Sequence, residues 1–178
     1  MKKVISSIVM LMILLTMGVS ASAIHVEYED MGVPNVNSSF KAWMDYRACA
    51  WGSTQRNFSE RWAWIDSEGF MRCTGERDFG INDDYYLIAL GSYYGTTIGT
   101  KYRITTNTGN VFYGALGDMK DNRDTNRTNQ YSDYYNVVEF LVHTPSLRSD
   151  VKKWGSANVY MPLNGSIAKI EKMNFVWD

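Results

Sequence analysis

Short segments with a period of two dominate the chain from Phe40 onward, as is typical of β-strands. The first segment places apolar side chains on one face, namely Phe40, Ala42, Met44, Tyr46 and Ala48. Further strands are expected at residues 85–91, 100–105, 110–117, 136–143 and 166–173, because each is short and bounded by Gly, Asn, Asp or Pro. The pattern predicts a mainly β fold, either a closed barrel or a sandwich.

Turn and helix signals divide the rest of the chain. Residues 61–73 are expected to form a hairpin, and residues 107–110 fit a tight turn with Gly109 in the left-handed conformation. One short helix is expected at residues 146–155, whereas Ser59 marks no more than a helical turn. Residues 24–38 show no sustained period, so we predict a tail or linker there and a single domain over residues 39–178.

The first 23 residues have the pattern of an export signal. Two lysines precede an apolar run over residues 8–17, and small residues ending in Ala23 follow it. The apolar run is shorter than the ~20 residues that cross a bilayer. We therefore expect a secreted or wall-associated protein that begins at Ile24 and keeps no stable membrane anchor.

Charge and composition narrow the choice of ligand. The chain has a net charge of −1, and loss of the two signal lysines leaves −3, whereas a nucleic-acid-binding protein needs a cationic excess. Aromatic residues make up 14% of the chain, with six Trp and twelve Tyr. Aromatic rings stack on the C–H faces of sugars, so this composition suits a carbohydrate, although β-strands also favour aromatic residues.

Cys49 and Cys73 are the only cysteines. In an oxidising exported setting we predict one disulfide between them, closing a loop of about 25 residues and contributing ~2 to 4 kcal/mol. Neither CxxC nor HxxxH occurs, so no zinc site is expected. Asp118, Asp121 and Asp124 recur every three residues, but their spacing is not that of an EF-hand loop, and we expect no metal and no cofactor.

Residues 85–142 resemble the double-psi β-barrel of the three-aspartate domain found in secreted wall-lytic proteins. Ile98-Gly99-Thr100-Lys101 matches the LGTK element of that family, Asp118 stands at its second aspartate and Glu139 at its third. Related barrels occur in lytic transglycosylase A and in expansins. The resemblance implies a six-stranded double-psi barrel over residues 81–178, preceded by a β extension over residues 39–80 that has no counterpart in the family.

The family's pattern is not complete in this chain. Gly91 and Ser92 stand where the first aspartate is expected, glutamate replaces aspartate at position 139, and the loop between the two carboxylates is longer. These departures bear on activity more than on fold, because the double-psi barrel carries several functions.

As an enzyme, the chain would resemble a lytic transglycosylase or muramidase that cleaves peptidoglycan or a related polysaccharide as a monomer. Glu139 would be the general acid, since a partly dehydrated carboxyl on an apolar strand holds its proton near neutral pH. Asp118 would orient the sugar or act as the partner base. Tyr93, Tyr94 and Lys101, next to the LGTK-like turn, would contact the saccharide.

Other interpretations stay open. Glu139 could be an ordinary outward strand residue paired with a Lys or Arg. The same groove could bind a wall polysaccharide without cutting it, as in expansins, and the missing first aspartate favours this alternative. A secreted factor that binds a protein through an aromatic surface is a third class, with no motif in its favour.

Overall fold

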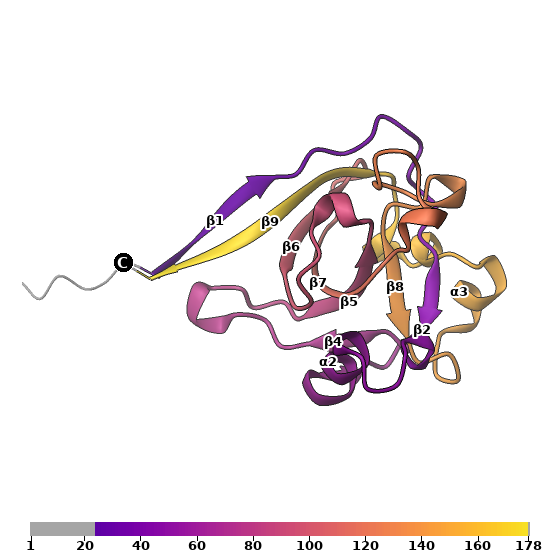
Figure 1. The fold of residues 1–178 in the computed structure, drawn as a ribbon, viewed down its shortest axis with the longest axis horizontal. Coiled ribbons are helices and arrows are strands. Elements are labelled where there is room, and N and C mark those ends of the chain that lie inside the picture. Colours follow the sequence, from indigo (N-terminus) through magenta and orange to yellow (C-terminus); the bar gives the residue numbers. More distant parts are fainter. Residues whose placement is uncertain (1–23, 178) are drawn as a thin grey trace, which may run out of the picture.

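The computed structural model describes residues 24–177, so the predicted export signal over residues 1–23 lies outside the described residues. Within the described part, nine strands form one mixed sheet, accompanied by two α-helices and short 3-10 helices (Figure 1). The mainly β fold is therefore confirmed.

The strands are β1 (Ile24–Asp30), β2 (Trp43–Asp45), β3 (Ala63–Ile65), β4 (Met71–Cys73), β5 (Tyr85–Leu90), β6 (Lys101–Thr106), β7 (Val111–Met119), β8 (Glu139–Val142) and β9 (Ile167–Trp177). The α-helices are α2 (Thr54–Trp62) and α3 (Ser149–Trp154). The 3-10 helices are η1 (Tyr46–Ala48), η2 (Arg77–Phe79), η3 (Ser92–Tyr94), η4 (Asn122–Asp124), η5 (Asp133–Tyr135), η6 (Ala157–Val159) and η7 (Met161–Leu163).

β5 is the central strand of the sheet. It pairs in parallel with β7 and antiparallel with both β4 and β8, while β2 joins in parallel to β8. β6 lies between β7 and β9, and β1 pairs with the outer side of β9. The strand ladder does not close on itself. Just before β2, however, the Ser38 hydroxyl donates to the Ile167 carbonyl at 3.4 Å and accepts from the Ile167 N–H at 3.0 Å.

The core explains why the β5 sequence YYLIAL is apolar at every position. Tyr86, Ile88 and Leu90 belong to the larger core cluster, whereas Leu87 and Ala89 belong to the smaller cluster. A strand whose two faces are both buried has no solvent face on which polar residues would alternate.

The two strands β1 and β9 form a ribbon that extends away from the other strands (Figure 1). β1 occupies Ile24–Asp30, which was predicted to be a tail or linker, so that prediction is wrong for these residues. Phe79 of η2 packs edge-on against Phe175 and Trp177 of β9, with ring centroids 4.9 and 4.7 Å apart. These aromatic contacts support the ribbon along its length.

Local sequence signals predicted some of the hairpins, turns and helices and missed others. The 61–73 hairpin is confirmed, as are the helix within 146–155 and the turn at Gly109, whose φ is +86°. α2 was not predicted as a helix, although Ser53 caps it by accepting a hydrogen bond from the Arg56 N–H at 3.1 Å. Its residues are mostly polar, so no apolar stripe of helical period identifies it.

The predicted disulfide is absent, because Cys49 and Cys73 are both free and buried. Each sulfur has a different polar neighbour. The Cys49 thiol lies 3.5 Å from Asp118 Oδ2, and the Cys73 sulfur lies 3.4 Å from Lys101 Nζ. Residues 39–80 are therefore held on the domain by noncovalent contacts, among them the pairing of β2 with β8 and of β4 with β5.

Candidate functional site

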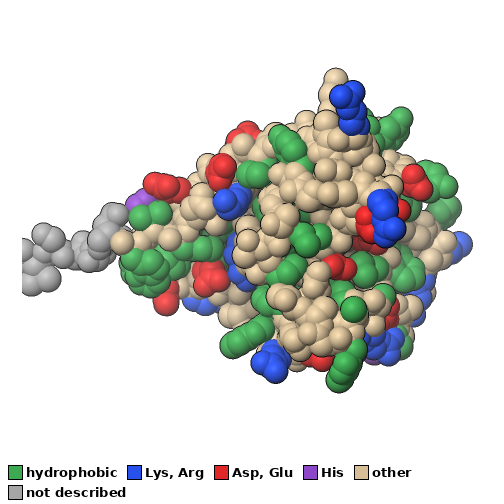
Figure 2. All heavy atoms as spheres, in the orientation of Figure 1, with side chains coloured by type: hydrophobic (Ala, Val, Ile, Leu, Met, Phe, Trp, Pro, Cys, Tyr) green, Lys and Arg blue, Asp and Glu red, His purple; other side chains and the backbone are tan. Residues whose placement is uncertain are grey.

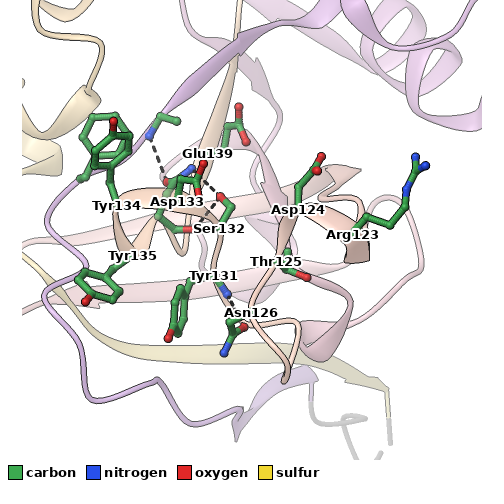
Figure 3. Close-up of a pocket in the computed structure, with 13 residues that line it drawn as sticks. Arg123, Asp124, Thr125, Asn126, Tyr131, Ser132, Asp133, Tyr134, Tyr135 and Glu139 are labelled. Carbon is green, nitrogen blue, oxygen red and sulfur yellow. Dashed lines mark hydrogen bonds between the residues drawn. The ribbon is translucent and has the colours of Figure 1, made fainter.

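A cavity of about 850 Å³ lies beside the long loop that connects β7 to β8. Most of its walls come from residues 123–126 and 131–136 of that loop, and the rest from Phe40, Ala42 and Glu139 (Figure 3). We call it the tyrosine pocket, after Tyr131, Tyr134 and Tyr135. The polar segment between β7 and β8 therefore supplies much of a concave surface.

The aromatic rings of the pocket pack in two pairs. The centroids of Tyr131 and Tyr135 are 5.6 Å apart in an edge-on arrangement, and those of Tyr134 and Phe40 are 5.4 Å apart. Tyr134 is 78% exposed. Aromatic rings with accessible faces are suited to stacking on a ligand as well as on each other.

The loop holds two of these tyrosines in an unusual backbone conformation. Tyr134 and Tyr135 both have a φ of +56°, in the left-handed region that bulky residues rarely adopt. Each such residue costs roughly 1–2 kcal/mol and persists only where neighbouring contacts enforce it. Strained residues of this kind cluster at functional sites, so the conformation singles out this loop.

Asn136 enforces the strained turn. Its backbone N–H donates to the carbonyls of Ser132 at 3.3 Å and Asp133 at 3.1 Å, and its Oδ1 accepts from the Ala42 N–H at 3.1 Å. Asn136 is buried. Its side chain thereby ties the pocket loop to the segment that leads into β2.

Glu139 begins β8 and faces the pocket with a side chain that is 22% exposed. Its Oε2 accepts a hydrogen bond from Lys120 Nζ at 3.1 Å, and the same ammonium donates to Ser132 Oγ at 3.1 Å. The Lys120 side chain is only 3% exposed. Burial lowers the pKa of Lys120, while the Glu139 carboxylate acts in the opposite direction. The pairing of Glu139 with a basic residue matches the alternative interpretation of this position.

Asp118 lies near Glu139 but does not line the tyrosine pocket. Ala89 of β5 pairs with Asp118 on one side and with Glu139 on the other, so the two acidic residues stand in one row across three strands. Two interstrand spacings put their Cα atoms roughly 10 Å apart. Asp118 Oδ1 accepts from the Met119 N–H at 2.8 Å, and Oδ2 lies by the Cys49 thiol. The structure therefore places the two acids on the strands that flank β5, but opens only Glu139 to the pocket.

The three residues predicted to contact a saccharide lie elsewhere. Tyr94 is fully buried, and its carbonyl accepts the Tyr102 hydroxyl at 2.8 Å, so it belongs to the core. Tyr93 is half exposed, and its N–H donates to the Asn129 carbonyl at 3.3 Å, so it supports the pocket loop from outside. The Lys101 ammonium lies 4.4 Å from the centroid of the Tyr85 ring and near Cys73. None of the three lines the tyrosine pocket.

The pocket residues that the sequence reasoning missed are Phe40, Tyr131, Tyr134, Tyr135 and Asp133. The available signal was the QYSDYYN segment, in which three tyrosines occur within a polar tract. Aromatic residues in a loop that cannot bury them have few reasons to be there other than contact with a ligand.

Charged side chains elsewhere on the surface are dispersed. On the face shown in Figure 2, lysine and arginine side chains alternate with acidic ones and form no extended basic area. Residues 24–177 contain no group of three His, Cys, Asp or Glu side chains arranged to hold a metal ion. In the same part of the chain, no helix is both long and apolar enough to span a membrane.

Comparisons with known proteins do not assign a family. No protein-family model matches the chain, and no curated protein or solved structure matches it either. The function is therefore inferred from the tyrosine pocket and from the sequence resemblance of residues 85–142 to the three-aspartate domain.

Proposed function

We propose that this protein binds a polysaccharide of the cell wall, such as peptidoglycan, in the tyrosine pocket without cleaving it. The observation that carries this proposal is the pairing of Glu139 with the buried Lys120 inside an aromatic-walled cavity. An ammonium 3.1 Å away stabilises the negative charge of a carboxylate. A charged carboxylate accepts hydrogen bonds from sugar hydroxyls but has no proton to give to a glycosidic oxygen.

The other walls of the pocket fit the same ligand class. Tyr131, Tyr134 and Tyr135 offer rings for stacking, and Asn126 and Thr125 add amide and hydroxyl groups close by. A cavity of about 850 Å³ is within the usual range for small-ligand sites. It is large enough for a short stretch of a glycan rather than for a whole protein surface.

The proposed fold is a six-stranded double-psi barrel, for which residues 81–178 supply the five strands β5 to β9, so the sixth would be β2 from the segment expected to be an extension. Two features support it: the two parallel pairs, β5 with β7 and β2 with β8, and the contact of Ser38 with Ile167 across the gap between β2 and β9. Export and a wall location remain part of the proposal, because they depend on residues 1–23.

The pocket loop also accounts for the missing first aspartate of the resemblance. A Cβ at Gly91 would overlap the carbonyl oxygen of Asn129, so the longer loop covers the site where that aspartate would stand. Ser92 next to it is engaged with the same loop, through a 2.7 Å hydrogen bond to Asn122 Oδ1. Gly91 and Ser92 thus stand in place of the first aspartate, and the loop covers that position. Both features favour binding of a polysaccharide over its cleavage.

A second candidate is glycan cleavage by a lytic transglycosylase mechanism. The placement of Asp118 and Glu139 on either side of Ala89 favours it, because it puts two carboxyl groups in one row across β7, β5 and β8. In this mechanism Glu139 protonates the glycosidic oxygen as its bond to C1 breaks. The C6 hydroxyl of the sugar then attacks C1 and gives its proton to the Glu139 carboxylate, which leaves a 1,6-anhydro product. Glu139 must then hold a proton despite the nearby Lys120.

One experiment separates the two candidates. The purified protein is incubated with insoluble peptidoglycan, and we measure both cosedimentation and soluble fragments by mass spectrometry. Cosedimentation without anhydromuropeptides supports binding, whereas fragments that disappear in Glu139→Gln support cleavage. If neither cosedimentation nor soluble fragments are detected, both candidate functions are wrong.

Matched variants locate the site. Tyr135→Ala is expected to weaken cosedimentation several-fold, since stacking of a ring is worth roughly 1 kcal/mol. Trp154→Ala on α3 removes another exposed aromatic ring that does not line the tyrosine pocket, and should leave binding unchanged. If Tyr135→Ala and Trp154→Ala weaken cosedimentation equally, the polysaccharide contacts the protein outside the tyrosine pocket.

A further inference from the structure

The tyrosine pocket carries an unbalanced negative charge. Three carboxylates line it, those of Asp124, Asp133 and Glu139, and the one basic side chain in its lining is Arg123. Lys120 lies beneath Glu139 and is already engaged by that carboxylate and by Ser132. The negative charge that stays available to a ligand therefore comes from Asp124 and Asp133.

Arg123 pairs directly with Asp121 rather than with these two acids, although its charge also attracts Asp124. Its Nη2 lies 2.6 Å from Asp121 Oδ2 and its Nε 3.1 Å from Asp121 Oδ1, and its side chain extends away from the rest of the pocket (Figure 3). Among residues 24–177, no side chain forms a hydrogen bond or ion pair with the carboxylate of Asp124 or Asp133. Both carboxylates are exposed and can therefore contact a ligand in the pocket.

The aromatic walls favour the same sign of ligand charge. Asp133 immediately precedes Tyr134 and Tyr135, and the rings of Phe40 and Tyr131 complete the wall around them. The face of an aromatic ring attracts a cation, and the attraction grows when carboxylates stand close to the ring. An anionic group is repelled by Asp124 and Asp133, and an N-acetylated group has no positive charge for them to attract.

We infer that the tyrosine pocket selects saccharides that carry a protonated amine, such as hexosamine units without their acetyl groups. This inference depends on the proposed function, and it specifies the ligand class of that same site. The ammonium would lie between the tyrosine rings and the carboxylates of Asp124 and Asp133, while the sugar hydroxyls meet Glu139 and the loop amides.

The test compares two oligosaccharides of equal length that differ only in acetylation. We expect a glucosamine hexamer to bind at least ten times more tightly than the N-acetylglucosamine hexamer, measured by calorimetry at pH 6 and moderate salt. Equal affinities would overturn the inference and leave the proposed function standing. Binding of neither oligosaccharide would overturn the inference, and absence of peptidoglycan cosedimentation as well would overturn the proposed function too.

Variants separate a specific site from general attraction of a cation to an acidic protein. Asp133→Asn and Asp124→Asn should each weaken binding of the amine-bearing hexamer about fivefold, as expected for loss of one charge at close range. Affinity for the N-acetylated hexamer should not change. Glu27→Gln on β1 removes an exposed acid that does not line the pocket, and should change neither affinity. A loss of the same size in Glu27→Gln would contradict a specific pocket.

Discussion

Lys120 lies beneath the tyrosine pocket and donates a 3.1 Å hydrogen bond to Glu139, whose own side chain opens into that pocket. One member of the pair is almost fully buried, and the other meets solvent and any ligand. The hydrogen bond holds the Glu139 carboxylate in position. Because Lys120 is buried beneath the pocket, a ligand cannot displace its positive charge from Glu139.

The first prediction concerns this pair. Lys120→Met should destabilise the protein by about 2 kcal/mol, because it leaves the half-buried Glu139 carboxylate without its cation. Adding Glu139→Gln to that variant should recover about 1 kcal/mol, since a neutral amide needs no counter-charge. Urea denaturation of the two single variants and the double variant measures this coupling. Additive losses would mean that the pair does not interact energetically.

The second prediction separates stability from binding at the strained turn. Tyr134→Asn should leave stability unchanged or raise it by up to ~1 kcal/mol, because asparagine adopts a positive φ more readily than tyrosine does. The same variant should lose affinity for the saccharide, as the exposed ring is gone.

Tyr131→Asn is the matched control, because Tyr131 packs against the larger core cluster and is not among the residues with positive φ. This variant should lose ~1 to 2 kcal/mol of stability. Thermal unfolding of both proteins gives the comparison. Equal destabilisation would show that the left-handed conformation at Tyr134 carries no cost.

The third prediction concerns the thiols. Burial and the neighbouring Asp118 raise the pKa of Cys49 to about 12, and burial also raises the pKa of Cys73 while Lys101 opposes that shift. Thiolates are the reactive form, so neither cysteine should react with a disulfide reagent in the native protein at pH 8. Both should react at once in urea.

A different result would restore the disulfide prediction. If the protein purified without reductant shows no free thiol in urea and the mass of the oxidised form, then Cys49 and Cys73 are bonded in solution. Reduced thiols are the expected state, because the structure shows the two sulfurs unbonded.

Strands could be predicted where burial determines the pattern of apolar residues, whereas the path of the loops could not. The central strand β5 is apolar throughout because both of its faces are buried, and that signal is present in the sequence itself. β1 was missed because most of it is exposed and its partner β9 lies at the other end of the chain. No local pattern reports such a pairing.

The candidate site was only partly predictable for the same reason. Glu139 was identified from the family resemblance together with its place in a strand, but its partner Lys120 and its pocket depend on how the loop folds back. That path is set by Asn136, which reaches Ala42 across 94 residues of sequence. Residue periodicity does not report contacts of this range, so the sequence does not reveal the path of the loop.

The last prediction concerns Lys41, a fully buried lysine in the segment before β2. Its ammonium donates to the carbonyls of Ser39 and Gly165 and to Asn158 Oδ1, all neutral acceptors. Burial lowers the pKa of Lys41 from 10.5 to about 8. The folded protein therefore binds fewer protons than the unfolded chain between these two values.

Stability contributed by this group must rise with pH across that window and be lost as the pH falls through about 8. The difference between the wild type and Lys41→Met in free energy of unfolding should grow in favour of the wild type by about 3 kcal/mol from pH 7 to pH 10.5. Urea titrations at several pH values measure it, and tyrosine ionisation cancels because both proteins share it. A difference that is constant with pH would mean that Lys41 keeps its ordinary pKa, and that the three neutral acceptors offset the cost of burying its charge.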